Sequence, residues 1–166
     1  MDLRSIQKPF KEKYRSDPGT AQITLKAQGS QTGTPMACSV DIGRALYQAQ
    51  AHSGVGGAGT AACSGDLLLG ALAACAQLTC QMVATALGIS TNHIEVQVEG
   101  DLDLRGTLGV SKEALVGFET IRVTFEIDAP DATAEQLISL REKTEQYCVV
   151  MQTLAHPPVL QVNWHE

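Results

Sequence analysis

The strongest constraint on how this chain folds is a long uncharged segment, because no Asp, Glu, Lys or Arg occurs over residues 67–94. Residues 67–87 are dense in Leu and Ala, which favour helix, and Gly88 is placed to end that helix. Ser64 or Asp66 can cap its start. A helix without a charged face is buried on nearly all sides in a globular protein. We therefore expect other elements, or a second subunit, to surround this helix.

The same segment is just long enough to cross a membrane. Four polar residues interrupt it, however, and no basic residues flank it. The interrupting residues are Gln77, Thr79, Gln81 and Thr85. The pattern favours a buried core helix, so we expect no membrane contact.

Length and charge narrow the class of protein further. The 166 residues are 44% hydrophobic, which is typical of one globular domain, here expected over 1–166. The net charge is −6 and the cations are not clustered, so nucleic-acid binding is not expected. The start of the chain lacks the pattern of a secretory signal, which predicts a cytoplasmic protein.

Alternation of apolar and polar residues predicts several strands around the central helix. Residues 1–19 are polar and basic, and we expect them to form an N-terminal arm that ends in a turn at Asp17-Pro18-Gly19. A loop is expected over 29–35. The expected strands cover 20–28, 36–42, 94–104, 120–127 and 160–164.

A second helix is expected after residue 132. Thr133 and Gln136 have the spacing of a capping box, and Cys148 closes the helix or opens a further short one through Leu154. The Pro157-Pro158 pair then breaks helicity. Strands, a buried helix, strands, helix and strand together predict an α+β fold.

The segment 53–65 is rich in Gly, Ala and Ser, and Gly54, Gly56 and Gly59 formally match the GxGxxG pattern of dinucleotide-binding proteins. That pattern requires an apolar strand directly before it and a helix directly after it. Neither is expected here, so the segment predicts a loop and not a nucleotide site.

The chain has five cysteines, and their odd number without an export signal argues against a disulfide framework. No CxxC pair occurs and the histidines lack metal-ligand spacing, so neither a metal site nor another cofactor is expected. Cys38 and Cys80 are interpreted as core residues. Cys63, before the central helix, is either a small packing residue or a third redox thiol.

Cys75 and Cys148 are the cysteines with functional potential, although each could instead be a packing residue. Cys75 lies in the middle of the central helix, where Thr79 and Met82 share its face. That apolar surround raises a thiol pKa, so a nearby cation would be needed to form a thiolate. If Cys148 begins a helix, the first amides of that helix would lower its pKa.

Two sequence motifs resemble a known family. The segment 63–75 carries an acidic residue, a Leu-rich stretch and a Cys after two small residues. It resembles the central-helix motif of the osmotically inducible protein C and organic hydroperoxide resistance (OsmC/Ohr) family. The preceding segment 52–57 is similar to the family's Gly-Gly loop, and 147–154 resembles its second-cysteine segment. The resemblance extends over about residues 20–164.

The resemblance implies an OsmC-like fold, in which antiparallel sheets wrap the central helices of an intertwined homodimer with sites at the subunit interface. It implies that Cys75 is the peroxidatic thiolate and Cys148 the resolving thiol. It also implies an N-terminal arginine, for which Arg15 is the candidate, paired to an acid. The position of the acid is occupied by Gly65, so Asp66 is the neighbouring candidate, although it could equally cap the helix. This departure points to a divergent OsmC-like branch.

The leading hypothesis is therefore a cytoplasmic dimeric thiol peroxidase that reduces organic hydroperoxides and is itself reduced by an external dithiol. The resemblance implies that this dithiol is of the lipoyl type. The alternative is a non-catalytic or weakly reactive protein that binds a lipophilic molecule at the dimer interface. Catalysis requires the sulfur atoms of Cys75 and Cys148 to lie close together, whereas the alternative does not.

Overall fold

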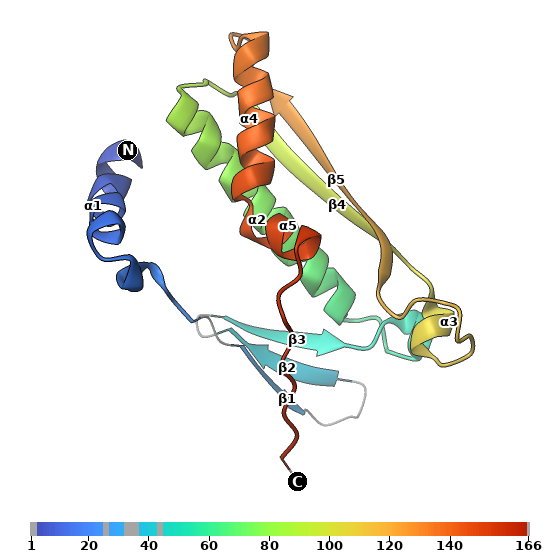
Figure 1. The fold of residues 1–166 in the computed structure, drawn as a ribbon. Helices are drawn as coiled ribbons and strands as arrows, with labels where there is room; N and C mark the ends of the chain where they lie inside the picture. Colours follow the sequence, from blue (N-terminus) through green and yellow to red (C-terminus); the bar gives the residue numbers. More distant parts are fainter. Residues whose placement is uncertain (1–2, 25–26, 32–36, 43–44, 166) are drawn as a thin grey trace. The chain divides into compact units, whose positions relative to one another are not determined.

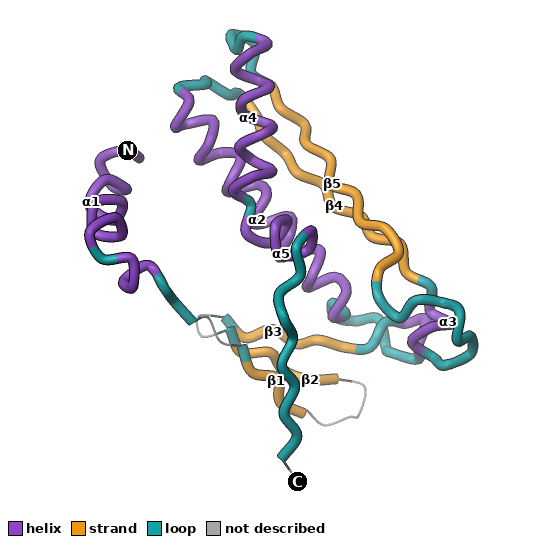
Figure 2. Tube along the Cα trace, in the orientation of Figure 1, coloured by secondary structure: helices purple, strands orange, loops and turns teal. Residues whose placement is uncertain are grey.

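The fold was analysed in a computed structural model, which describes residues 3–24, 27–31, 37–42 and 45–165 (Figures 1 and 2). The chain divides into two compact units. The first unit comprises Met1–Gly70 and Glu99–Arg122, and the second comprises Ala71–Val98 and Val123–Glu166. Three long elements, the helix α2 (Ser64–Leu87) and the strands β4 (His93–Leu102) and β5 (Phe118–Asp128), contribute residues to both units.

The first unit begins with a helix where we expected an arm. Helix α1 covers Leu3–Ser16, and Lys13 and Arg15 lie in its last turn, where positive charge is favourable. The 3-10 helix η1 (Pro18–Ala21) follows. It replaces the start of the strand predicted over 20–28, because Pro18 favours a turn and Thr20 donates hydrogen bonds to the Asp17 carbonyl from its N–H and hydroxyl. Residues 25 and 26 of that prediction lie outside the described residues.

An antiparallel sheet in the order β1-β2-β3 follows, formed by β1 (Gln28–Gln31), β2 (Ala37–Asp41) and β3 (Leu46–Gln50). Strand β2 confirms the strand predicted over 36–42. Strand β1 lies partly where we expected a loop, and β3 was not predicted because its sequence is rich in glutamine. Cys38 pairs with Ala49 in the register, but its side chain lies outside what the structure describes.

The glycine-rich segment after β3 is a loop, as predicted, and it contains the short 3-10 helix η2 (Ser53–Val55). Gly56 and Gly59 have φ of 92° and 69°, values that favour glycine. A Cβ on Gly57 would lie 1.6 Å from the Ala51 carbonyl oxygen. The glycines therefore serve the path of the chain, and α2 begins only at Ser64.

Within the first unit, β4 ends earlier than predicted. Asp103 accepts the N–H of Arg105 and caps the short helix α3 (Leu104–Thr107), so Leu104 is helical and not part of the strand. Leu102 is 40% exposed, so it does not belong to the inward face of β4.

The core of the second unit joins α2, the inward faces of β4 and β5, and the helix α4 (Ala134–Tyr147). Strands β4 and β5 form a two-stranded sheet and run in opposite directions, and Asn92 N–H bonds the Asp128 carbonyl where they meet (Figure 1). Their alternating burial confirms the two predicted strands. The buried cluster at its centre consists of Cys80, Val83, Ala84, Ile89 and Leu140.

The helix ends of this unit follow the sequence signals. Gly88, with φ of 70°, ends α2. Thr133 and Gln136 form the predicted capping box at the start of α4. Cys148 ends α4 and is also the residue before α5 (Val149–Ala155), so both predicted roles are combined in one residue. Helix α5 ends just before the predicted break at Pro157-Pro158.

The single chain leaves apolar residues exposed in two segments that were expected to be ordered and covered, although for the helix a second subunit was also allowed. Helix α2 buries one face only, and Leu78 and Met82 on the other face are 58% and 43% exposed. The final strand is also missing, because 156–165 form neither helix nor strand and Leu160 and Trp164 are 85% and 88% exposed. A strand needs a neighbouring strand for its hydrogen bonds, and the described residues of this chain offer none to this segment.

Within the described residues, α2 is long and apolar enough to cross a membrane by length and composition. The core helix of a globular protein passes the same test. Because α2 contributes Cys80, Val83 and Ala84 to the core cluster, it serves as a core helix here.

Candidate functional site

The structure brings Cys75 and Cys148 together within the second unit. Cys75 lies in the middle of α2 and is partly exposed, whereas Cys148 is 0% exposed at the junction of α4 and α5. The Cys148 thiol lies close enough to the Cys75 sulfur to lower the pKa of Cys75 as a hydrogen-bond donor. Two neighbouring thiols of this kind can form a disulfide after a small local motion.

The environment of Cys75 favours its thiolate. Burial raises the pKa of the Cys75 thiol, but four hydrogen bonds outweigh burial and leave that pKa below its ordinary value. The donors, in order of decreasing effect, are the Val150 N–H, the Cys148 thiol, the Thr79 hydroxyl and the Val149 N–H. The two amides belong to the first turn of α5, where N–H groups have no partner within the helix.

Cys148 has the opposite tendency. Burial raises the pKa of its thiol, and the hydrogen bond and negative charge of Cys75 raise it further, while amides of Met151 and Val150 lower it only in part. The amides at the start of α5 lower the pKa of Cys148, as expected, but burial and the neighbouring Cys75 outweigh them, so the net shift is upward. Cys148 is fully buried beside the more acidic Cys75. The pair thus consists of one accessible sulfur that favours the thiolate and one buried sulfur that favours the thiol.

The sequence argument required a cation to form the thiolate, but neutral donors lower the pKa of Cys75 here. Spacing had placed Thr79 on the face of Cys75, although not as a donor, and the first amides of α5 were expected to act on Cys148 and not on Cys75. Arg15 is exposed near the end of α1 and belongs to the first unit. Its role at the site stays a prediction.

Asp66 acts locally at the start of α2. Its Oδ2 accepts the Cys63 N–H at 2.8 Å, which is one half of a capping box. Hydrogen bonds from the N–H and the thiol of Cys63 hold the pKa of Asp66 below its usual value, and His52 contributes in the same direction. Asp66 thus has the expected capping role. Cys63 is half-buried, and its N–H donates the hydrogen bond to Asp66.

Cys80 lies in the core, as predicted, and is 1% exposed. Burial raises the pKa of its thiol, and the nearby Thr144 hydroxyl offsets this only in part. Cys80 is thus a neutral thiol at physiological pH. Among the residues that the structure describes, no group of three or more His, Cys, Asp or Glu side chains could hold a metal ion.

The difference in acidity between the two thiols is measurable. We expect iodoacetamide to alkylate Cys75 with a pH midpoint below that of an ordinary thiol, and Cys148 with a midpoint above it. The reactive form is the thiolate, so the alkylation rate of Cys75 falls only as pH drops through its lowered pKa. Peptide mass spectrometry after timed labelling gives both profiles.

Thr79→Val removes one donor while keeping the side-chain shape. It should raise the pKa of Cys75 and slow its alkylation near neutral pH by roughly two- to tenfold, the value of one hydrogen bond. Thr85→Val is the matched control, because the Thr85 hydroxyl bonds the Gln81 carbonyl. A Cys75 midpoint at or above the ordinary value would contradict this account of the site.

Comparison with solved structures finds the same fold in several proteins. An OsmC-like protein from Mycoplasma pneumoniae is 15% identical, with a TM-score of 0.67 over 82% of this chain and 90% of that chain. An organic hydroperoxide resistance protein from Elizabethkingia anophelis is 20% identical, with a TM-score of 0.57 over 82% and 91%. A third, from Legionella pneumophila, described as an organic hydroperoxide resistance protein OsmC, is 19% identical, with a TM-score of 0.58 over 81% and 90%.

No curated protein matches the sequence significantly. The sequence does match the family described as OsmC-like protein over residues 57–163, which is more than half of the 166 residues. This match includes α2 with Cys75 and the junction of α4 and α5 with Cys148. The α+β fold, the structural neighbours and this match agree, and the chain belongs to the OsmC-like protein family.

Proposed function

We propose that the protein is a thiol-dependent peroxidase that reduces organic hydroperoxides, with Cys75 as the attacking thiolate and Cys148 as the resolving thiol. The observation that carries this proposal is the unequal thiol pair. Cys75 is accessible and has a lowered pKa, and its hydrogen-bond donor Cys148 is buried and has a raised pKa. Attack on a peroxide needs an accessible thiolate such as Cys75. Resolution of the sulfenic acid needs a second thiol close to it, here Cys148.

The chemistry balances in two steps. The Cys75 thiolate attacks the terminal oxygen of ROOH, the O–O bond breaks, and the alkoxide takes up a proton and leaves as ROH, so Cys75 becomes a sulfenic acid. The Cys148 sulfur then attacks the Cys75 sulfur and displaces the hydroxyl group as water, which forms the 75–148 disulfide. An external dithiol reduces this disulfide by exchange and becomes a disulfide itself. In this proposal the dithiol is of the lipoyl type.

The apolar surroundings of Cys75 support an organic peroxide as the substrate. Leu72 and Ala76 flank this part of α2 on its buried side, and Leu78 and Met82 lie on its exposed side. Such a surface favours an alkyl or aryl group over the small polar hydrogen peroxide. Relatives described as organic hydroperoxide resistance proteins support the same class.

The proposed active form is a homodimer in the cytoplasm. The exposed apolar residues of α2 and of the segment 156–165 support it, because exposed apolar surface of this kind marks an interface. A second copy would complete the apolar surroundings of Cys75 at the subunit interface. Within this proposal Arg15 is the candidate cation of the site. Asp66 is the acid proposed with Arg15, and it holds the start of α2 at the same time.

Mass spectrometry after one equivalent of cumene hydroperoxide tests the proposal. We expect the wild-type protein to form a disulfide between Cys75 and Cys148. We expect Cys148→Ser to stop at a sulfenic acid on Cys75, which dimedone traps, because the resolving sulfur is missing.

Cys80→Ser is the control for this experiment, because Cys80 is equally buried but does not contact Cys75. It should still form the 75–148 disulfide. Equal oxidation of all five thiols, or a wild-type protein in which Cys75 stays reduced, would remove the support for a peroxidase.

A further inference from the structure

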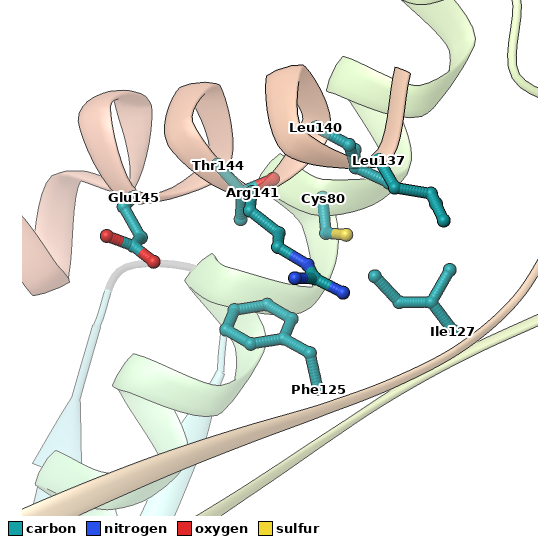
Figure 3. A pocket seen from close by; sticks show the side chains of 8 residues that line it. All are labelled: Cys80, Phe125, Ile127, Leu137, Leu140, Arg141, Thr144 and Glu145. Atoms are coloured by element: carbon teal, nitrogen blue, oxygen red, sulfur yellow. The ribbon is translucent and has the colours of Figure 1, made fainter. Parts of the chain in front are cut away.

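The second unit also contains a cavity. This cavity of about 370 Å³ opens between α2, β5 and α4, and neither Cys75 nor Cys148 lines it (Figure 3). This volume is within the range of small-molecule pockets. The lining residues are Cys80, Phe125, Ile127, Leu137, Leu140, Arg141, Thr144 and Glu145.

The interior of this cavity is apolar with one polar group. Thr144 is only 2% exposed, and its hydroxyl has no hydrogen-bond partner of ordinary geometry among the described residues. Its neighbour is the Cys80 thiol, which is a weak partner. A buried hydroxyl without a proper partner is costly, so a ligand that offers a hydrogen bond is favoured there.

The opening of the cavity carries a positive charge. Arg141 is exposed and, among the described residues, forms no ion pair or side-chain hydrogen bond. Figure 3 shows its side chain extending from α4 toward Phe125 and Ile127. Glu145 turns to the other end of the cavity in the same view. The guanidinium is therefore available to an anionic group that enters beside Phe125.

We propose that this cavity binds an amphipathic monocarboxylate, with its alkyl chain among Phe125, Ile127 and Leu140 and its carboxylate between Arg141 and Thr144. A carboxylate accepts hydrogen bonds from both the guanidinium and the hydroxyl. One guanidinium matches a single negative charge, and the apolar walls match an unbranched chain. The inference goes beyond the proposed peroxidase, because binding here requires neither Cys75 nor Cys148.

Isothermal titration calorimetry with decanoate, below its micelle concentration, tests this site. We expect saturable binding of one decanoate per protomer, and the same binding in Cys75→Ser, so that failure of the peroxidase proposal leaves this test intact. Arg141→Gln should weaken decanoate at least about tenfold, the value of a charge-assisted hydrogen bond, and should leave decanol unchanged. Lys143→Gln is the control, because it makes the same charge change on α4 outside the cavity lining.

Thr144→Val tests the contribution of the buried hydroxyl to binding separately from that of the Arg141 charge. It keeps the shape of the side chain, so the ligand-free protein should keep its thermal midpoint or gain in it, while decanoate binds several-fold more weakly. The proposal is overturned by the absence of saturable binding to the wild type. It is equally overturned if Arg141→Gln and Lys143→Gln weaken decanoate alike, or if Thr144→Val leaves its affinity unchanged.

Discussion

Replacing Cys75 by serine is expected to lower the rate of organic hydroperoxide consumption by at least about a thousandfold. The reacting species is a thiolate, and a serine hydroxyl at the same position stays protonated at neutral pH. The amides of Val149 and Val150 would still point at this position, but they would have no anion to stabilise. Loss of cumene hydroperoxide in the presence of a lipoyl-type dithiol measures the rate.

Cys63→Ser is the matched control for that experiment. Cys63 is also on α2's N-terminal side and partly exposed, and serine at this position can still donate to Asp66 and cap the helix. It should therefore retain the wild-type rate and stability. If Cys75→Ser consumes hydroperoxide at the normal rate, or if Cys63→Ser does not, the assignment of the chemistry to Cys75 is wrong.

Leu78→Lys is expected to convert the proposed dimer into monomers, with a dissociation constant raised at least about a hundredfold. Leu78 is 58% exposed on a helix that has no charged residue after Asp66, and Met82 continues the same exposed face one turn later. In a dimer a lysine there would be buried without a partner. In a monomer it would be solvated, so the fold itself should tolerate the change.

Sedimentation velocity across a range of protein concentrations measures this effect. Gln97→Lys is the control, because Gln97 is an exposed polar residue of β4 and the substitution adds the same charge. It should leave the dimer intact. A wild-type chain that sediments as a monomer, or a Leu78→Lys protein that remains a dimer, would exclude α2 from the subunit contact.

The parts of the fold that could be predicted are those whose signals are local. The charge-free segment gave α2, the period-two patterns gave β4 and β5, and the spacing of Thr133 and Gln136 gave the start of α4. Strand β3 could not be predicted because its glutamines carry no pattern of burial. The segment 160–164 has the alternation of a strand but finds no neighbouring strand in the described part of one chain.

The candidate site was predictable only in part. The motifs around Cys75 and Cys148 suggested two cooperating thiols through their resemblance to a family, since spacing alone does not bring together residues so far apart in sequence. The net direction of the pKa shift of Cys148 could not be predicted, because the sequence does not reveal that Cys148 is buried beside Cys75, which outweighs the amides of α5. A tertiary contact decides that question.

The donors to Cys75 have a consequence for how such proteins diverge. The donors at positions 149 and 150 are main-chain N–H groups, which every residue except proline has. These two positions therefore require no particular residue type. A chain can therefore make a sulfur acidic without a charged side chain beside it, provided that the backbone path is preserved. Identities of only 15–20% to proteins of the same fold are compatible with that route.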